Sequence, residues 1–257
     1  MEWYHYLIAI AGSALAGAIN TLAGNGSAIT LTILTELLGL PGNMANGTNR
    51  IGIFTQSAAS TYVFYRSGRL NLSQSGRGIA ITTLGALVGI WVATIVSSEQ
   101  FKEVFRYLLV VMLVVMLVKP ERWLHETDTT RQFSPWITIP VFLALGFYGG
   151  FIQMGMGIFF LAAMVLGARY SLTDSNAVKS AVVGLYNFLA ILIFAWNGQV
   201  DWKLGALMAI GQTAGGYFTA RFATTSPKAN IWAHRVLIAV VTIAVVKMFN
   251  LHTIFLR

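Results

Sequence analysis

The chain of 257 residues contains no cysteine and few charged residues. Without cysteine it cannot form a disulfide, a thiolate metal site or a thiol nucleophile. Charged residues make up 10% of the chain, whereas soluble domains average about 25%. No run of Lys and Arg with interleaved aromatic residues indicates a nucleic-acid partner. These absences exclude most soluble and nucleic-acid-binding classes.

Hydrophobic residues dominate instead, at 56% of the chain, and the mean hydropathy is +0.68. A helix needs about 20 mainly apolar residues to cross a bilayer. Runs without Asp, Glu, Lys or Arg recur along the whole chain, at residues 3–35, 78–98, 107–118, 132–168, 180–200 and 204–220. The sequence therefore predicts an all-α polytopic membrane protein, with the lipid bilayer as its surroundings.

Two of these runs are interrupted by glycine where a plain helix favours Leu or Ala. The first interruption reads Gly24-Asn25-Gly26-Ser27, and the second reads Gly155-Met156-Gly157. Paired glycine-interrupted segments in corresponding halves of a chain indicate the binding site of a transporter. The two Gly-x-Gly segments are 131 residues apart.

Other features repeat in the same order on both sides of a polar stretch near the middle of the chain. A helix that opens at residues 46–50 corresponds to one that opens at residues 176–180, and Gly68 corresponds to Gly198. We therefore predict two transmembrane repeats, residues 1–119 and 136–257, joined by a polar loop at residues 120–135.

Each repeat is expected to hold one broken segment, at about 3–40 and 136–168, and three spanning helices. The predicted spanning helices are 44–65, 77–97 and 102–119, then 174–196, 203–222 and 231–249. A broken segment that re-enters on its own side leaves three crossings, an odd number, so the second repeat is inverted. If each broken segment instead crosses once, the two halves are parallel, and that alternative stays open.

The loop cations favour inversion. On that topology, ten Lys and Arg residues lie on one side of the membrane and five on the other. Cytoplasmic loops carry an excess of Lys and Arg, so both termini are expected outside a bacterial cytoplasmic membrane.

The two breaks are the predicted binding site. Where a helix restarts inside the membrane, its first amides and the positive end of its dipole favour an anion. The predicted substrate-binding residues are Asn20, Thr21, Gly24, Asn25, Gly26, Ser27, Asn46, Thr48, Asn49, Arg50, Gln153, Gly155, Gly157, Lys179 and Ser180. Close helix packing is the competing explanation for glycine in membrane helices. We expect packing for Gly12, Gly17, Gly85, Gly89, Gly211 and Gly215.

Arg50 and Lys179 are the two cations that the topology places in neither a loop nor a membrane edge. Charged groups inside the bilayer are costly and usually functional, so we expect them to offset the charge of an anion. The alternative is that each side chain extends to the headgroups from a nearby helix end. Gln56 and Asn187, also 131 residues apart, are candidates for substrate contacts or for hydrogen bonds between helices.

The motifs resemble those of the TauE/SafE family of sulfite exporters over nearly the whole chain. The residues that carry the resemblance are Asn20-Thr21-Leu22-Ala23-Gly24-x-Gly26-Ser27 and Ala45-Asn46-x-Thr48-Asn49-Arg50, then the segment from Gly146 to Gly157 and Asn197-Gly198-Gln199-Val200-Asp201-Trp202. The resemblance implies a bacterial cytoplasmic-membrane permease for sulfite, thiosulfate or sulfur-containing organic anions. Asn25 and Gln153 depart from the family pattern.

We therefore expect a secondary transporter that moves a small oxyanion by alternating access, with a passive anion channel as the alternative. No nucleotide-binding motif is present, so the transport would be driven by a coupling ion such as the proton or by the substrate gradient. No cofactor, metal site or enzymatic activity is expected. A homo-oligomer is a further candidate assembly.

Overall fold

The computed structural model describes residues 3–22, 24–117, 135–167, 171–225 and 242, and every regular element in these ranges is helical. The predicted loop 120–135, apart from Pro135, and the predicted helix 231–249, apart from Thr242, lie outside the described residues. The prediction of an all-helical protein is confirmed.

The described helices fall into two sets with the same element order. The first set is α1 (Trp3–Leu22), α2 (Ser27–Thr32) continuing into the π-helix η1 (Ile33–Leu37), α3 (Gly42–Arg66), α4 (Leu72–Ile95) and α5 (Ser98–Leu117). The second set is α6 (Pro135–Phe151), α7 (Met156–Ala162) continuing into the π-helix η3 (Ala163–Gly167), α8 (Leu172–Trp196) and α9 (Trp202–Ala223). The predicted breaks are present, between α1 and α2 and between α6 and α7.

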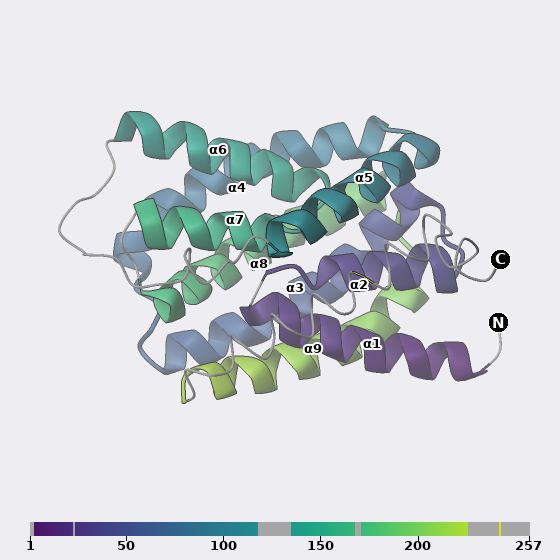
Figure 1. Cartoon of the computed structure of the whole chain (residues 1–257), viewed down its shortest axis with the longest axis horizontal. Coiled ribbons are helices and arrows are strands. Elements are labelled where there is room, and N and C mark those ends of the chain that lie inside the picture. The colour runs from purple at the N-terminus through teal and green to yellow at the C-terminus, as the bar shows by residue number, and fades with distance from the viewer. Residues whose placement is uncertain (1–2, 23, 118–134, 168–170, 226–241, 243–257) are drawn as a thin grey trace.

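After each break the short helix folds back along the helix that precedes it. Gly26 lies against the carbonyl oxygen of Ala16, and further on the side chain of Ile33 reaches Gly12. In the second set the rings of Tyr148 and Phe159 lie 6.0 Å apart. Each broken segment is therefore a hairpin of two helices whose tip lies inside the bundle (Figure 1).

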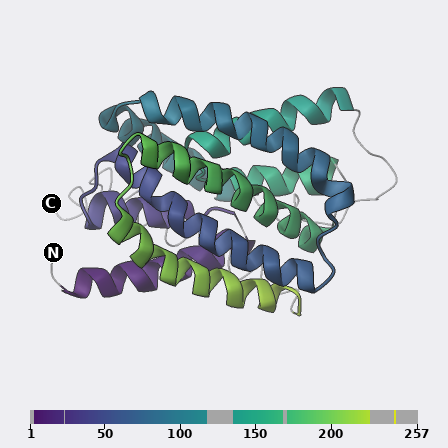
Figure 2. The same ribbon diagram turned by 180° about the vertical axis from the view of Figure 1, so that it is seen from behind.

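The long helices form a layer in which the two sets alternate. Seen from behind, α4, α8, α3 and α9 lie side by side in that order (Figure 2). Helix α6 packs along α4 at one edge, and α1 packs along α9 at the other. The resulting order, α6-α4-α8-α3-α9-α1, reads the same from both edges once corresponding helices of the two sets are exchanged.

Glycine allows the outer helix pairs to approach closely. A Cβ atom on Gly89 of α4 would lie 2.0 Å from the carbonyl oxygen of Phe147 on α6, and one on Gly215 of α9 would lie 1.9 Å from that of Ala14 on α1. A Cβ atom on Gly17, Gly85 or Gly211 would lie 2.1–2.2 Å from a main-chain or hydroxyl oxygen of a neighbouring helix. A Cβ atom on Gly12 would lie 2.5 Å from the side chain of Ile33. The predicted packing role of these glycines is confirmed.

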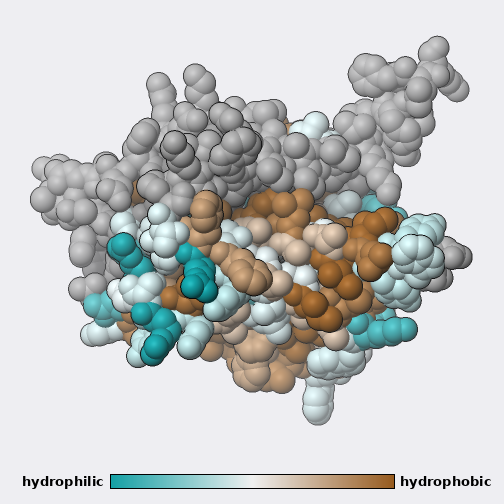
Figure 3. All heavy atoms as spheres, turned by 90° about the horizontal axis from the view of Figure 1, so that it is seen from below, coloured by the Kyte–Doolittle hydropathy of each residue, from teal (hydrophilic) through white to brown (hydrophobic). Residues whose placement is uncertain are grey.

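The surface fits a lipid environment. On one face hydrophobic residues gather in the middle and hydrophilic residues at the two ends (Figure 3). By length and composition, three described helices are apolar enough to cross a membrane, at Trp3–Leu22, Ser75–Ile95 and Thr173–Trp196. Two of them match predicted crossings. The remaining one is α1, which we expected as part of a re-entrant segment and which proves to be a full 20-residue helix.

Helix α3 is polar because it lies at the centre of the layer. Its buried residues include seven polar or charged ones, Asn46, Thr48, Asn49, Arg50, Gln56, Ser57 and Ser60. At 25 residues it is about 37 Å long, enough to span a bilayer. Mean hydropathy misses such a helix, since its polar side chains contact protein.

Candidate functional site

The tips of the two hairpins touch. The amide of Gly157 donates a hydrogen bond of 3.2 Å to the carbonyl oxygen of Gly24. A Cβ atom on Gly24 would lie 2.3 Å from the Cα of Gly157, and a Cβ on Gly157 would lie 2.3 Å from the Cα of Gly24. Gly24 and Gly155 both have a φ of +74°, which favours glycine. Only residues without a side chain allow this crossing of two main chains.

The other two break glycines are also covered by protein atoms. The position of a Cβ on Gly26 is 2.0 Å from the carbonyl oxygen of Ala16, and on Gly155 it is 2.4 Å from the sulfur of Met112 on α5. Close approach at these four glycines is therefore approach of protein to protein. Their predicted contact with a ligand stays a prediction.

Arg50 of α3 is completely buried and binds the C-terminal end of α6. Its Nη1 donates to the carbonyl oxygen of Gly149 at 2.9 Å, and its Nη2 donates to those of Gly150 at 2.7 Å and Phe151 at 3.2 Å. Nη2 also donates to Oδ1 of Asn46, one turn earlier on α3, at 3.0 Å. The guanidinium thus lies at the negative end of the α6 dipole.

Lys179 of α8 has the same relation to α1. It is 3% exposed, and its Nζ donates to the carbonyl oxygens of Asn20 at 3.0 Å and Thr21 at 2.8 Å. It also donates to Oδ1 of Asn176, three residues earlier on α8, at 2.6 Å. The proposed extension of Arg50 and Lys179 to lipid headgroups is therefore wrong, because both side chains lie inside the bundle.

Neither buried cation has a carboxylate partner in the described part of the chain. The two ion pairs found there are Arg69–Asp174, at 3.9 Å, and Arg106–Glu103, at 3.3 Å, and both are partly exposed. No Asp or Glu is buried among the described residues. The two cations are thus compensated by helix ends and amide oxygens alone.

A hydrogen-bonded network joins the first break to α3. The Nδ2 of Asn20 donates to Oε1 of Gln56 at 2.7 Å, and Nε2 of Gln56 donates to the hydroxyl of Thr21 at 3.0 Å. The hydroxyls of Thr21 and Ser60 lie 3.2 Å apart, and Ser60 donates to the carbonyl oxygen of Gly216 on α9. Gln56 therefore bonds between helices.

A second network joins the other break to α8. Oε1 of Gln153 accepts hydrogen bonds from the hydroxyl of Tyr186 and from Nδ2 of Asn187. Oδ1 of Asn187 accepts from Nη1 of Arg50 at 3.3 Å. Gln153 has a φ of +66°, which is strained for a residue with a side chain. We predicted Gln153 as a donor to substrate, and it is held in this conformation by α8.

Four predicted residues keep unused hydrogen-bonding groups although they are buried. No hydrogen-bond partner is found in the described structure for Oγ of Ser27, Nδ2 of Asn49, Nε of Arg50 and Oγ of Ser180. Oδ1 of Asn49 accepts from Nε2 of Gln212 on α9 at 3.5 Å. These four groups come from α2, α3 and α8.

Thr48 of α3 contacts the loop at residues 197–201, which connects α8 and α9. Its hydroxyl accepts from the amide of Asp201 at 2.9 Å, and Nε2 of Gln199 donates to the carbonyl oxygen of Thr94 at 3.0 Å. Gly47 makes this possible, because a Cβ there would lie 2.1 Å from the carbonyl oxygen of Gln199. The predicted site residue Thr48 thus supports the fold at the bundle end.

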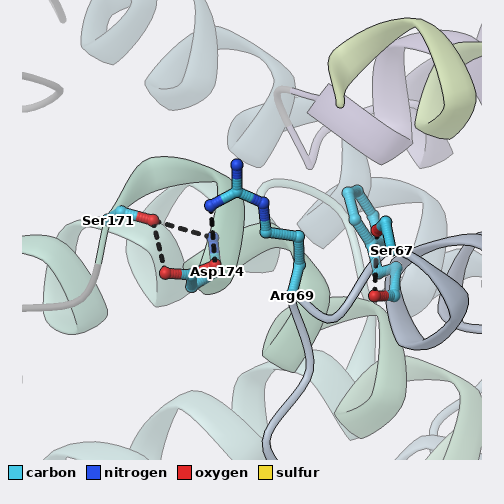
Figure 4. A network of polar contacts seen from close by, with 5 residues as sticks. Ser67, Arg69, Ser171 and Asp174 are labelled. Atoms are coloured by element: carbon cyan, nitrogen blue, oxygen red, sulfur yellow. Dashed lines mark hydrogen bonds and ion pairs between the residues drawn. The ribbon is translucent and has the colours of Figure 1, made fainter. Parts of the chain in front are cut away.

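The corresponding loop after α3 makes a looser contact with α8. There Arg69 reaches Asp174, whose amide and carboxylate bond to the hydroxyl of Ser171 at 3.1 and 2.7 Å (Figure 4). Ser171 caps the first turn of α8. This contact is made through partly exposed side chains, whereas the loop at residues 197–201 packs by its main chain.

Sequence reasoning missed three residues of the site. Tyr186 stands in an apolar run and Gln212 among small residues, and neither is marked by a spacing or a motif. Asn176 was visible as the counterpart of Asn46, but its bond to Lys179 was not foreseen. Within the described ranges, no group of three or more His, Asp or Glu side chains is placed to hold a metal ion.

The sequence is similar to known proteins over most of its length. The sequence model of the family described as "Sulfite exporter TauE/SafE" matches residues 9–248. A probable membrane transporter protein, ORF9, from Sinorhizobium sp is 29% identical over 210 residues, which cover 81% of this chain and 79% of that protein. The probable membrane transporter protein YfcA from Escherichia coli (strain K12) is 28% identical over 211 residues, covering 80% and 76%.

A probable membrane transporter protein from Haemophilus influenzae is 26% identical over 216 residues, with 83% of each chain covered. No solved structure matches the chain. Since the family model covers nearly the whole sequence and the helices are apolar, the chain belongs to the TauE/SafE family and is a multi-pass membrane transporter.

Proposed function

We propose that the protein is a secondary transporter that moves a small oxyanion across the bacterial cytoplasmic membrane by alternating access. The observation that carries this proposal is the burial of Arg50 and Lys179 without a buried carboxylate among the described residues. A helix C-terminus supplies about half a negative charge, so each cation is only partly compensated. An anion at the centre would offset the remainder, and a cation would be repelled.

In this proposal the anion lies beside the touching hairpin tips, on the side of Ser27, Asn49, Arg50 and Ser180, because the amides of Gly24, Met156 and Gly157 are already bonded to carbonyl oxygens. Buried hydrogen-bonding groups that stay unpaired cost about 1–3 kcal/mol each. Four such groups are present on Ser27, Asn49, Arg50 and Ser180, and an oxyanion accepts hydrogen bonds from all of these chemical types. Arg50 and Lys179 act mainly through their charge, because most of their donors are already bound to carbonyl oxygens.

The substrate class follows from the family. Its description names sulfite, while the relatives are named only as membrane transporters. We propose sulfite, thiosulfate or a sulfur-containing organic anion as the cargo. The drive is the substrate gradient or a coupled ion such as the proton.

The helix arrangement supports two inverted repeats, residues 1–119 and 136–257. Helix α1 begins at the end of the bundle where the N-terminus lies, and α6 begins at the opposite end (Figure 1). The helix order is symmetric under exchange of the two sets. Such inverted repeats, with broken helices meeting at mid-depth, are typical of alternating-access carriers. On this topology both termini lie on the outer side.

Counterflow in proteoliposomes tests the proposal. Vesicles loaded with unlabelled sulfite or thiosulfate should take up the ³⁵S-labelled anion faster than empty vesicles, since a carrier exchanges substrates across the membrane. Sulfate and chloride serve as comparison anions. Gly24→Ala should abolish this uptake, and the control Gly78→Ala should preserve it, because nothing lies within 4 Å of a Cβ on Gly78.

Two results would overturn the proposal. Uptake that is insensitive to anion on the trans side would indicate a channel. Lack of uptake of any sulfur oxyanion by the reconstituted wild type would remove the assigned cargo.

A further inference from the structure

We propose that Arg50 and Lys179 are positioning residues that act crosswise, each fixing the helix break of the opposite repeat. Arg50 belongs to the first set and holds the second break, while Lys179 belongs to the second set and holds the first. In the proposed function, Arg50 and Lys179 offset the charge of a bound anion. The inference here assigns them a second task, to hold the helix breaks, which they perform whether or not an anion is bound.

The first step is the need of a broken helix inside a membrane. The last carbonyl groups of a helix have no partner within the helix, and no water replaces it in the hydrocarbon region. Helix α6 ends at Phe151 and α1 ends at Leu22, and the break that follows each end, at residues 152–155 and 24–26, is buried. At the end of α1 the amide of Gly24 donates to the carbonyl oxygens of Ile19 and Asn20. The carbonyl groups that this local bond does not serve, that of Thr21 and those at the end of α6, require a donor from elsewhere.

The second step is the origin of that donor. At the end of α6, Arg50 reaches the carbonyl oxygens of three successive residues, 149–151, and Nδ2 of Asn46 adds a bond of 2.9 Å to that of Phe151. At the end of α1, Lys179 reaches those of Asn20 and Thr21. All these bonds cross from one set of helices to the other.

The third step is that both cations are held in the same way on their own helix. Arg50 is bonded to Asn46 and Lys179 to Asn176, each about one helical turn earlier on the same face. Asn46 and Asn176 occupy corresponding positions of α3 and α8. Arg50 corresponds to Ser180, so Lys179 lies one residue before the matching place. The same device within one residue of corresponding positions indicates a shared task.

The fourth step concerns side-chain shape. The planar guanidinium presents several donors in a fixed fork and serves three carbonyl groups, whereas the ammonium is a compact charge that serves two. Arg50→Lys therefore keeps the positive charge but loses some of the hydrogen bonds to the carbonyl groups at the end of α6. If the charge of Arg50 alone held the second break in place, Arg50→Lys would change the structure of that break little.

The absence of cysteine provides a direct test in the empty protein. Ile152→Cys reports on the second break and Leu22→Cys on the first, and both native side chains are buried. The rate of N-ethylmaleimide labelling is measured for each reporter in purified protein without any added anion. The cation variants are Arg50→Lys, Arg50→Gln and Lys179→Gln, with Arg221→Lys as the control at an exposed cation of α9.

We expect each cation variant to affect the reporter at the break of the opposite repeat. Arg50→Lys and Arg50→Gln should speed labelling of the Ile152→Cys reporter by about tenfold, the effect on local opening of losing one hydrogen bond to a charged group. They should leave the labelling rate of the Leu22→Cys reporter within about twofold of its value without the Arg50 substitution, since Arg50 makes no hydrogen bond to α1. Lys179→Gln should give the reverse pattern, and Arg221→Lys should change neither rate.

Three results would overturn the inference. Equal acceleration of both reporters would indicate general loosening, acceleration on the same set would contradict the crossed arrangement, and unchanged rates would show that neither cation positions a break. Arg50→Lys retains the positive charge, so changed thiol ionisation does not explain its effect. Because no anion is present, the outcome is independent of the transport assay.

Discussion

At the scale of single residues, the breaks are governed by the space beside the main chain. Gly24 and Gly157 meet with no room for a Cβ atom on either side, and Gly24 also has a left-handed φ. The sequence correctly located these glycines at helix breaks. It assigned their closeness to a ligand, because a single repeat viewed by itself does not show that the neighbouring main chain comes from the other repeat.

Gly24→Ala is expected to destabilise the protein strongly. A left-handed conformation costs about 1–2 kcal/mol for a residue with a Cβ, and forced overlap in a packed interior costs about 1–3 kcal/mol more. Thermal unfolding in detergent measures the loss, with Gly78→Ala as the matched control on a helix with open space. Equal stability of the two variants would show that the hairpin tips can move apart without cost.

Gln153 allows the strain of a break to be separated from its hydrogen bonds. Gln153→Gly removes both the bonds to Tyr186 and Asn187 and the strain of a φ of +66°, whereas Gln153→Ala removes only the bonds. We expect the Ala variant to be less stable than the Gly variant by about 1 kcal/mol. The same unfolding assay compares them, and a more stable Ala variant would contradict the conformational argument.

At the scale of helices, sequence patterns placed the elements well and their partners poorly. The breaks, the helices that open near residues 46 and 176 and the burial of Arg50 and Lys179 were all expected from glycine spacing and charge. The acceptors of these cations were not, because they are carbonyl groups 99–101 and 158–159 residues away in the chain. Main-chain acceptors leave no signature in a sequence, since every residue carries one.

Small residues set the distance between helices, and Gly215 offers a test at this scale. Gly215→Ala should force α9 away from α1, since its Cβ would lie 1.9 Å from the carbonyl oxygen of Ala14, and we expect a loss of about 1–3 kcal/mol. Gly76→Ala on α4 is the control, because nothing lies within 4 Å of the added atom. Unfolding temperatures of both variants check this, and an unchanged value for Gly215→Ala would mean that the pair can separate freely.

At the scale of the whole molecule, the two ends of the bundle differ although the helix order is symmetric. Gly47 lets the loop at residues 197–201 pack by its main chain on α3. The corresponding residue on α8 is Ala177, and the corresponding loop reaches α8 by the ion pair of Arg69 and Asp174. The repeated order of helices was expected from the sequence, whereas this difference between the two sets rests on the single methyl group of Ala177.

The two ends should therefore respond differently to substitution. Gly47→Ala would place a Cβ 2.1 Å from the carbonyl oxygen of Gln199 and should cost about 1–3 kcal/mol. Arg69→Ala removes a partly exposed ion pair at 3.9 Å and should cost less than about 1 kcal/mol. Chemical denaturation of both variants measures the contrast, and a larger effect of Arg69→Ala would reverse the ranking of the ends.

The pairing of α1 with α9 also has a consequence for biosynthesis. The two helices are separated by about 180 residues of chain, which a ribosome translating at about 5–20 residues per second needs on the order of ten seconds or more to make. Throughout that interval the face of α1 that packs on α9, around Ala14 and Gly17, has no native neighbour. It must rest against lipid or the insertion machinery until α9 has been made.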